Sequence, residues 1–396
     1  MASERDAIVV AGHARTPMGG FQGAFAPLGA VDLGAAAVRA AVARAGVADT
    51  AVERIYMGCV LPAGLGQAPA RQAARKAGLS DSVEATTLNK MCGSGMQAVI
   101  LAAETLAAGA ADCIVAGGME SMTNAPYLLP RHRAGARIGH GRVLDSMMLD
   151  GLEDAYAPGK PMGAFAEEAA RHYGFGREAQ DAFALESLDR AQRAVASGAF
   201  AGEIVTVPVP GRKGTIEVAT DEQPGNARPD KVPLLRPAFS QDGTITAASS
   251  ASISDGAAAL VLTRVDKADR LGLVTQARIV ATAAHAHAPE WFTTAPVFAV
   301  RKALDRAGWT AAEVDLFEVN EAFAVVAMIA MRELGIDSDR MNVNGGATAL
   351  GHPIGASGAR ILVTLIAALR ARGGRRGIAS LCIGGGEATA VAIELI

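Results

Sequence analysis

Cysteine, histidine and asparagine side chains lie in or beside glycine-rich turns, and together they could carry out covalent chemistry. Cys92 lies in NKMCGSGMQAV (residues 89–99), directly before an apolar stretch with helical spacing. The free N–H groups and the positive dipole end of a helix start lower the pKa of a cysteine placed there. Gly93 and Gly95 would let a substrate approach the backbone. Taken alone, the turn leaves open whether Cys92 is a nucleophile or a structural residue.

Three residues in the second half of the chain complete a set for nucleophilic catalysis. His352 lies in NVNGGATALGHPIGASGAR (residues 342–360), at a second expected helix start, where an imidazole could accept the proton of Cys92. Cys382 ends an expected strand, and the three glycines after it could aim backbone N–H groups at an oxyanion. Asn320 lies where the strand in FEVNEAFA (residues 317–324) should finish. Together these residues could support nucleophilic catalysis by Cys92.

An internal repeat places these turns in equivalent positions. Residues 37–58 align without gaps on residues 299–320, with eight of 22 positions identical. The common offset of 262 carries the Cys92 turn onto the turn of His352. Chance similarity between alanine-rich helices is the alternative, and the matching glycine turns argue against it. We therefore expect two copies of one structural unit that face each other.

The elements around the turns alternate between strand and helix. Residues 7–12 and 112–118 are short apolar runs closed by glycine, which is typical of buried strands in a parallel sheet. Residues 35–46 and 95–111 have helical spacing. Between the two copies, residues 121–240 are rich in Met, Pro, Arg and Gly and contain only two helical patterns. The sequence therefore predicts an α/β fold with an inserted segment over its core.

The charge balance argues against nucleic acid as a partner. The chain has 37 basic and 40 acidic residues among 396, so it carries no broad positive surface. An anionic substrate would need a local patch. The basic clusters at residues 131–137 and 370–376 are candidate phosphate contacts, although clusters of this kind are more often solvated loops.

The cysteine content and the hydropathy pattern indicate a cytoplasmic protein. Four cysteines in so long a chain, without metal-ligand spacing, favour free thiols in a reducing compartment. The first 17 residues contain no signal-peptide core, and no apolar run approaches the length of a membrane span. His285 and His287 would share one face of a strand, but no third ligand lies near them in the sequence, so we expect no metal site.

Eight motifs, taken in order, resemble the thiolase family over essentially the whole chain. They are ARTPMGGFQG (14–23), NKMCGSGMQAV (89–99), MGAFAEEAA (162–170), LRPAF (235–239), DGAAA (255–259), NEAF (320–323), GGATALGHPIGASGAR (345–360) and CIGGG (382–386). Within the family, the pattern is most similar to bacterial acetyl-CoA acetyltransferases. The resemblance implies a thiolase fold, with a five-layered α-β-α-β-α core of two repeated halves and an inserted loop domain. The implied boundaries are 1–120 plus 249–271, 121–248, and 272–396.

The resemblance also implies a role for each reactive residue. Cys92 is the nucleophile, His352 accepts its proton, and Cys382 is the acid and base that acts on the second substrate. A water held by Asn320, together with His352, stabilises the enolate, and the N–H groups of Cys92 and Gly384 bind the tetrahedral oxyanion. The implied reaction is reversible Claisen condensation of two acetyl-CoA molecules to acetoacetyl-CoA. Coenzyme A (CoA) thioesters are its substrates, and it needs no cofactor.

Four positions match those that shape the substrate pocket of the family: Met162, Phe239, Ala251 and Phe323. Several neighbours depart from the family pattern. Pro161 stands where short-chain members often have His, and WFTTAP (residues 291–296) replaces a stretch that is often Met-Gly. Ala251 stands where a serine is common, and Glu387 and Ala388 follow CIGGG in place of Met-Gly or Gln-Gly. A degradative 3-ketoacyl-CoA thiolase for longer chains therefore remains the alternative.

Other classes of protein fit the sequence less well. Ketosynthases and hydroxymethylglutaryl-CoA synthases resemble the chain in using a cysteine on this fold, but they lack the second cysteine that stands here as Cys382. A non-catalytic acyl carrier would have no use for the four reactive residues together. The resemblance further implies a homodimer or, as we predict, a homotetramer, with residues 119–142 as the tetramerising loop.

Overall fold

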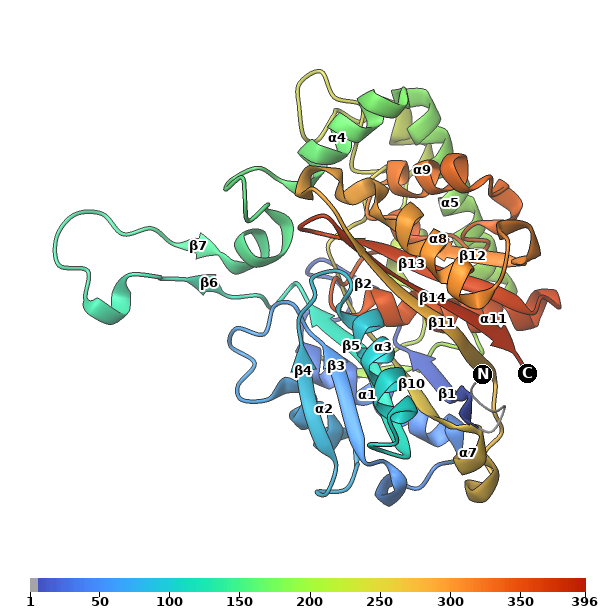
Figure 1. Ribbon diagram of the computed structural model, residues 1–396. Helices are drawn as coiled ribbons and strands as arrows, with labels where there is room; N and C mark the ends of the chain where they lie inside the picture. Colours follow the sequence, from blue (N-terminus) through green and yellow to red (C-terminus); the bar gives the residue numbers. More distant parts are fainter. Residues whose placement is uncertain (1–5) are drawn as a thin grey trace.

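Two sets of strands, one from each copy of the repeat, form the framework of the protein (Figure 1). The computed structural model describes residues 6–396, so the charged start of the chain at residues 1–5 lies outside the described residues. The first set, in spatial order, is β4 (Glu84–Leu88), β3 (Arg54–Gly58), β5 (Cys113–Ser121), β10 (Ser254–Arg264) and β1 (Ile8–Arg15). The second set is β11 (Ala277–Ala286), β14 (Glu387–Leu395), β13 (Arg376–Ile383) and β12 (Leu316–Val319).

Each set is a mixed sheet, so the prediction of parallel sheets was only partly right. β3 runs parallel to β4 and β5, whereas β10 runs antiparallel to both β5 and β1. In the second set, β12 is parallel to β13, and β14 is antiparallel to its neighbours. The two sets join where β1 pairs with β11 through Val9 and Val10. Buried apolar strands look alike in sequence whichever way their partners run, which explains the error.

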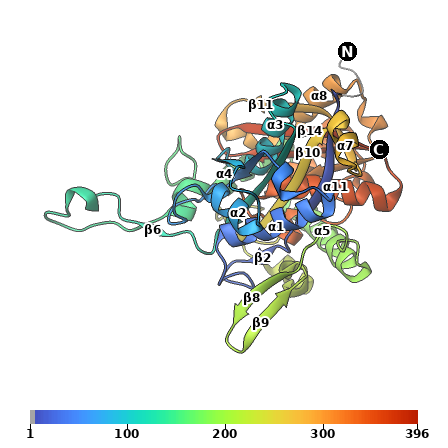
Figure 2. The ribbon, with the colours of Figure 1, turned by 90° about the horizontal axis from the view of Figure 1, so that it is seen from below.

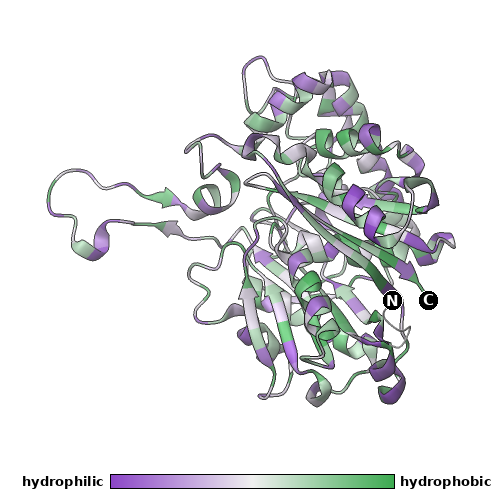
Figure 3. Ribbon diagram, in the orientation of Figure 1, coloured by the Kyte–Doolittle hydropathy of each residue, from purple (hydrophilic) through white to green (hydrophobic). Residues whose placement is uncertain are grey.

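The helices form three layers around the two sets of strands (Figures 1 and 2). The outer layers are α1 (Ala30–Ala45) with α2 (Pro69–Ala77), and α8 (Ala295–Ala307) with α9 (Ala324–Leu334). The central layer is α3 (Ser94–Ala107) with α11 (Ser357–Arg372), which share one core with strands of both sets. Strands are mostly apolar, while the outer helices carry hydrophilic stretches (Figure 3). The five-layered architecture is therefore confirmed.

The repeat in the sequence is a repeat of structure. Adding the offset of 262 to the bounds of β5 gives 375–383, which overlaps β13. The same operation carries α3 onto 356–369, within or beside α11, and β3 onto 316–320, where β12 lies. The turns that carry Cys92 and His352 therefore precede equivalent helices in the central layer.

The starts of α3 and α11 touch through their backbones, and glycines make this possible. A Cβ added at Gly358 would lie 2.4 Å from the Met96 nitrogen, and one at Gly95 would lie 2.9 Å from the Ala359 nitrogen. A Cβ at Gly118 of β5 would lie 2.0 Å from the Gly355 carbonyl oxygen. No larger side chain fits at these contacts, which bring the two reactive turns together.

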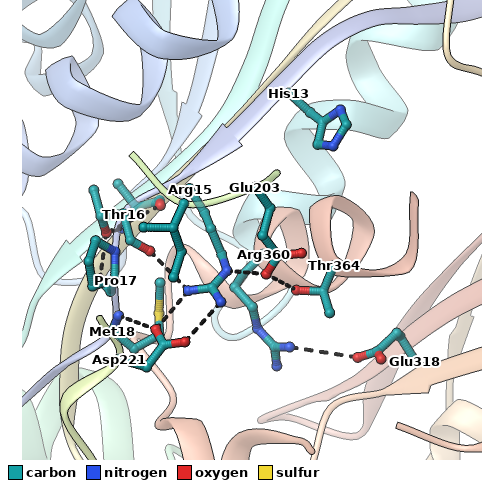
Figure 4. Close-up of polar contacts among 12 residues, drawn as sticks. His13, Arg15, Thr16, Pro17, Met18, Glu203, Asp221, Glu318, Arg360 and Thr364 are labelled. Atoms are coloured by element: carbon teal, nitrogen blue, oxygen red, sulfur yellow. Dashed lines mark hydrogen bonds and ion pairs between the residues drawn. The ribbon is translucent and has the colours of Figure 1, made fainter. Parts of the chain in front are cut away.

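The chain between β5 and β10 lies outside the layers. It contains an extended arm closed by β6 (Tyr127–Leu128) and β7 (Leu144–Asp145), which projects from the body (Figure 1), and then α4 (Met162–Tyr173) and α5 (Arg177–Ser197). A hairpin of β8 (Val207–Gly211) and β9 (Gly214–Val218) follows (Figure 2). Asp221, after this hairpin, binds the buried Arg15 of β1 at 2.7 Å (Figure 4). Among the described helices, none has both the length and the apolar character to cross a membrane.

The glycine contact between the central helices yields a first prediction. Substituting Gly358→Ala should cost about 1–3 kcal/mol of stability, because the added methyl overlaps backbone atoms of α3. Melting temperatures of the variant and the wild type would measure the loss. Gly202→Ala is the matched control, since a Cβ there meets no atom within 4 Å. Equal melting temperatures for the two variants would contradict the prediction.

Candidate active site

A cleft of about 910 Å³ lies where both halves and the intervening segment meet. Every predicted site residue except Asn320 lines it. These lining residues are Cys92, Met162, Phe239, Ala251, Phe323, His352, Cys382 and Gly384. Asn320 is buried beside the cleft, with its Nδ2 atom 3.5 Å from the ring nitrogens of His352. The residues that the sequence singled out for chemistry are therefore gathered in one place.

The turn of Cys92 is held by hydrogen bonds within itself. The Ser94 hydroxyl accepts the Lys90 N–H at 2.8 Å and donates to the Met91 carbonyl at 2.6 Å. Met91 has a positive φ of 46°, a conformation that few side chains adopt. A Cβ at Gly93 would lie 2.3 Å from Ile383, so the turn packs tightly on the end of β13. The nucleophile candidate is thus fixed against the strand that carries Cys382.

Burial dominates the ionisation of Cys92. It raises the pKa of the thiol to about 11, although the N–H groups of Gly384 and of Cys92 itself face the sulfur and lower the pKa. Glu120 raises the pKa further through its charge. The expectation that the helix start would lower the pKa was therefore wrong for the free protein, because desolvation of a thiolate outweighs the dipole. At neutral pH Cys92 is a thiol.

His352 is neutral and has a defined tautomer. Burial, assisted by the charge of Arg360, lowers the pKa of its imidazole to about 3. Its Nδ1 lies 2.6 Å from the Ser357 hydroxyl, which itself donates to the Pro353 carbonyl at 2.9 Å. Because the Ser357 proton is committed to Pro353, the serine oxygen accepts the Nδ1–H of His352. The Nε2 atom is left with a lone pair that can accept a proton.

The turn after β13 supplies the third part of the site. Burial, and then the proximity of Cys92, raises the pKa of Cys382 well above its usual value. Gly385 and Gly386 have φ values of 95° and 88°, which only glycine adopts without strain, and they turn the Gly384 N–H toward the Cys92 sulfur. The Asn320 Oδ1 atom is buried and accepts no hydrogen bond from the described residues. It is available to hold a polar group.

Three aromatic rings pack together in the lining of the cleft. Phe239 meets Phe323 edge to face at 5.7 Å between ring centroids, and Phe292 meets Phe323 in the same way at 6.4 Å. Phe239 lies directly over Gly163, where an added Cβ would overlap its ring at 2.4 Å. Phe292 belongs to the stretch that departs from the family pattern. It adds a large ring to the lining of the cleft.

Sequence reasoning missed several residues of the site. Ser357 and Glu120 touch the turn of His352, and an ion pair between Lys90 and Glu387 joins the turns of Cys92 and Gly384. The repeat could have revealed Glu120, because the offset of 262 carries it onto Cys382. Nothing in the sequence indicated the ion pair between Lys90 and Glu387, because the two residues are 297 positions apart.

Two other groups that the sequence singled out lie away from the cleft. The cluster at 131–137 is exposed on the arm, and Arg376 of the cluster at 370–376 stacks on Trp309 and pairs with Glu313. Neither cluster lines the cleft. His285 and His287 lie edge to face at 5.0 Å, and the Nε2 of His287 contacts the Trp291 carbonyl at 2.8 Å.

Comparisons with known proteins agree with this geometry. The family model "Thiolase, N-terminal domain" matches residues 8–266, and "Thiolase, C-terminal domain" matches residues 273–395. The chain belongs to the thiolase family. It is 49% identical to an acetyl-CoA acetyltransferase of Chromobacterium violaceum (98% of this chain, 99% of the relative). It is 46% identical to one of Schizosaccharomyces pombe over the same shares of the two chains.

A solved structure supports the same conclusion about the fold. The crystal structure of the Bacillus anthracis acetyl-CoA acetyltransferase superposes with a TM-score of 0.95 at 38% identity, covering 98% of this chain and 99% of the other. The thiolase fold is therefore established over nearly the whole chain, the cleft included.

The contact between His352 and Ser357 yields a second prediction. Ser357→Ala removes the acceptor that fixes the Nδ1–H tautomer, so kcat for thiolysis should fall by up to about 100-fold, as small misplacements of a reacting group do. Steady-state kinetics with acetoacetyl-CoA and CoA would measure it. Ser197→Ala, which removes a serine near the end of α5, is the control. A kcat equal to that of the control would show that Ser357 does not orient His352.

Proposed function

We propose that this thiolase is an acetyl-CoA acetyltransferase, which condenses two acetyl-CoA molecules reversibly to acetoacetyl-CoA and CoA. The observation that carries the proposal is the meeting of Cys92, His352 and Cys382 in one cleft, with the Gly384 N–H aimed at the sulfur of Cys92. The names of the similar proteins support it. A cysteine is suited to the reaction because its thioester is close in energy to that of CoA, so transfer is reversible.

Acetylation of Cys92 is the first step. The Cys92 sulfur attacks the carbonyl of the first acetyl-CoA while the Nε2 of His352 takes the thiol proton. The N–H groups of Cys92 and Gly384 stabilise the oxyanion, and each is worth about 3 kcal/mol of barrier. The bond from carbonyl carbon to CoA sulfur then breaks, and Cys382 gives its proton to the departing CoA thiolate. The enzyme is left with an acetylated Cys92, an imidazolium at His352 and a thiolate at Cys382.

Condensation follows from that charge state. The Cys382 thiolate removes the α-proton of the second acetyl-CoA, and its raised pKa makes it a strong base. The enolate oxygen is stabilised by the Nε2–H of His352 and by a water held at Asn320. The enolate carbon then attacks the acetyl group, and the sulfur of Cys92 leaves and recovers its proton from His352. Every group returns to its resting state.

The proposed reaction needs no metal and no redox cofactor. Hydrogen bonds and the imidazolium stabilise each negative charge that develops, and no electrons are transferred to an acceptor. CoA thioesters are the only small-molecule partners required. We also propose a cytoplasmic location, on the ground that the four cysteines described in the chain are free thiols.

The aromatic end of the cleft favours a short acyl group. We predict a higher kcat/KM for thiolysis of acetoacetyl-CoA than of 3-ketodecanoyl-CoA, because Phe292, Phe239 and Phe323 occupy the space that a longer chain would need. In Phe292→Ala the ratio of the two values should move at least about 10-fold toward the longer substrate. Phe298→Ala, on the partly exposed face of α8, is the control.

The outcome distinguishes the two thiolase functions. Preference of the wild type for the longer substrate would identify a degradative 3-ketoacyl-CoA thiolase and contradict the proposal. Failure of the wild type to cleave either substrate would contradict thiolase catalysis by this chain altogether.

We further propose that the thiolase is a homotetramer, assembled through the arm between β5 and α4. Tyr127, Ile138 and Val143 are exposed on the arm by 68%, 98% and 61%, which is unusual for large apolar side chains. A homodimer is the alternative.

Light scattering tests the assembly directly. The wild type should have four times the mass of the 40.3 kDa chain, and Tyr127→Asp combined with Ile138→Asp should reduce it to a dimer, because charges replace the apolar contact. Ile216→Asp, on the exposed face of the β8–β9 hairpin, should leave the mass unchanged. A wild-type mass of one or two chains would contradict the tetramer.

A further inference from the structure

Glu120 is a buried carboxylate at the junction of the two halves. It lies in β5, is fully shielded from solvent, and accepts backbone N–H groups from Val60 at 2.9 Å, Leu61 at 3.2 Å and Gly355 at 2.9 Å. The Cys59 thiol donates a fourth, weaker contact at 3.6 Å. Two of the three N–H donors follow β3 in the first half, and the third belongs to the turn of His352 in the second half.

The segments that Glu120 joins form the wall of the cleft around Cys92. Val60 and Ile354 line the cleft and pack in one apolar cluster with Cys92 and Met91. Gly355, whose N–H binds Glu120, directly follows Ile354 and lies three residues after His352. A Cβ at Gly355 would lie 2.6 Å from the Glu120 carboxylate, so the turn sits tightly on this side chain. Displacing the carboxylate would move the wall and the histidine together.

The internal repeat relates Glu120 to a residue of the second half. It occupies the position in β5 that Cys382 occupies in β13. Cys382 ends its strand beside the turn of Cys92, and Glu120 ends its strand beside the turn of His352. Each copy of the unit thus directs one titratable side chain at the reactive turn of the other copy. In the second copy this side chain is placed for chemistry, and in the first it binds backbone.

The charge of the Glu120 carboxylate does not stabilise the folded protein. Among the described residues, no lysine, arginine or histidine forms an ion pair with Glu120. A buried carboxylate without a cationic partner is costly, and a neutral acceptor could bind the same backbone groups at lower cost. The Oε2 atom of Glu120 accepts the N–H groups of both Val60 and Gly355 and so joins the two segments, while Oε1 accepts that of Leu61. A carboxylate makes such hydrogen bonds about twice as strong as a neutral acceptor does.

We propose that Glu120 is a positioning residue of the thiolase reaction, whose carboxylate holds the turn of His352 and the segment after β3 in register with Cys92. This inference rests on the proposed function. Glu120 touches neither substrate nor the reacting atoms, and it acts through the N–H groups of Gly355 and Val60.

The proposal has a pH signature. Burial raises the pKa of Glu120 to about 7, against its ordinary value of about 4.5. The titratable groups that interact with it are Cys59, directly after β3, and Cys92, in the turn before α3. At pH 8 the carboxylate is ionised and accepts all three N–H groups. As the pH falls through 7 it gains a proton, and the neutral carboxyl group accepts the N–H groups less strongly than the carboxylate does.

Ionisation of Glu120 should have opposite effects on stability and on activity: it lowers the stability of the fold and raises the rate of the reaction. Because the pKa is raised in the folded protein, protonation of Glu120 favours folding, and the buried charge lowers stability once the pH exceeds about 4.5, most fully above 7. At pH 8, removing the charge should therefore not lower the melting temperature, whereas it should lower activity. A side chain with a purely structural role would show a parallel loss of both.

Glu120→Gln tests the proposal. At pH 8 we expect kcat for acetoacetyl-CoA thiolysis to fall about 10-fold or more, with KM within two-fold of the wild type and an unchanged or higher melting temperature. The ratio of wild-type to variant kcat should shrink from pH 8 to pH 6, because the wild type loses its charge in that interval. Glu120→Asp keeps the charge on a shorter side chain and should keep the pH dependence at a reduced kcat.

Glu222→Gln is the matched control. Glu222 also accepts two backbone N–H groups, from Gly20 at 2.8 Å and Ala24 at 2.9 Å, but it does not line the cleft. This control should have wild-type kcat at both pH values. A kcat ratio for Glu120→Gln that stays constant between pH 6 and 8, or a melting temperature reduced in step with activity, would overturn the inference. An inactive wild type would instead overturn the proposed function, so the two failures are distinguishable.

Discussion

The close contact between the first turns of α3 and α11 is the constraint on which the site depends. The two helices belong to different halves of the chain, and glycines at positions 95 and 358 let their backbones touch. This contact sets the distance between the turns that carry Cys92 and His352, because both turns lead directly into these helices. The outer layers can vary in detail without moving the reactive groups. A displacement of α3 against α11 would separate the nucleophile from its base.

The same close packing surrounds the reactive groups with protein atoms, and the resulting burial sets their resting charge state. Burial raises the pKa of Cys92 to about 11 and lowers that of His352 to about 3, so the pair rests as thiol and imidazole and not as an ion pair. The proton must then move during attack on the substrate, and the N–H group of Gly384 stabilises the charge that appears. The arrangement stores no reactive thiolate before substrate arrives. N–H groups that the fold already holds in place need no reorganisation when this charge develops.

Local chemistry was predictable from the sequence, and contacts between distant segments were not. The glycine turns around Cys92 and His352, and the repeat that relates them, are signals within short stretches, and the five layers followed from the family resemblance. The direction of the strands was only partly predictable, since a buried strand such as β10 has the same composition whichever way its neighbours run. The pKa of Cys92 was predicted with the wrong sign, because burial depends on residues hundreds of positions away. The roles of the individual site residues stay predictions.

Buried charges connect the segment outside the layers to the two halves. Arg15 of β1 binds Asp221 and Glu203, which both lie beyond α5, and Glu203 also accepts a hydrogen bond from Thr364 of α11 at 3.1 Å (Figure 4). Nearby, Arg360 of α11 faces Glu318 of β12 at 3.6 Å, two residues before Asn320 (Figure 4). Breaking a buried pair is costly, whereas forming it adds little stability. These groups therefore fix the relative positions of the elements that they join. They hold α11, which follows the turn of His352, against β12, which leads to Asn320.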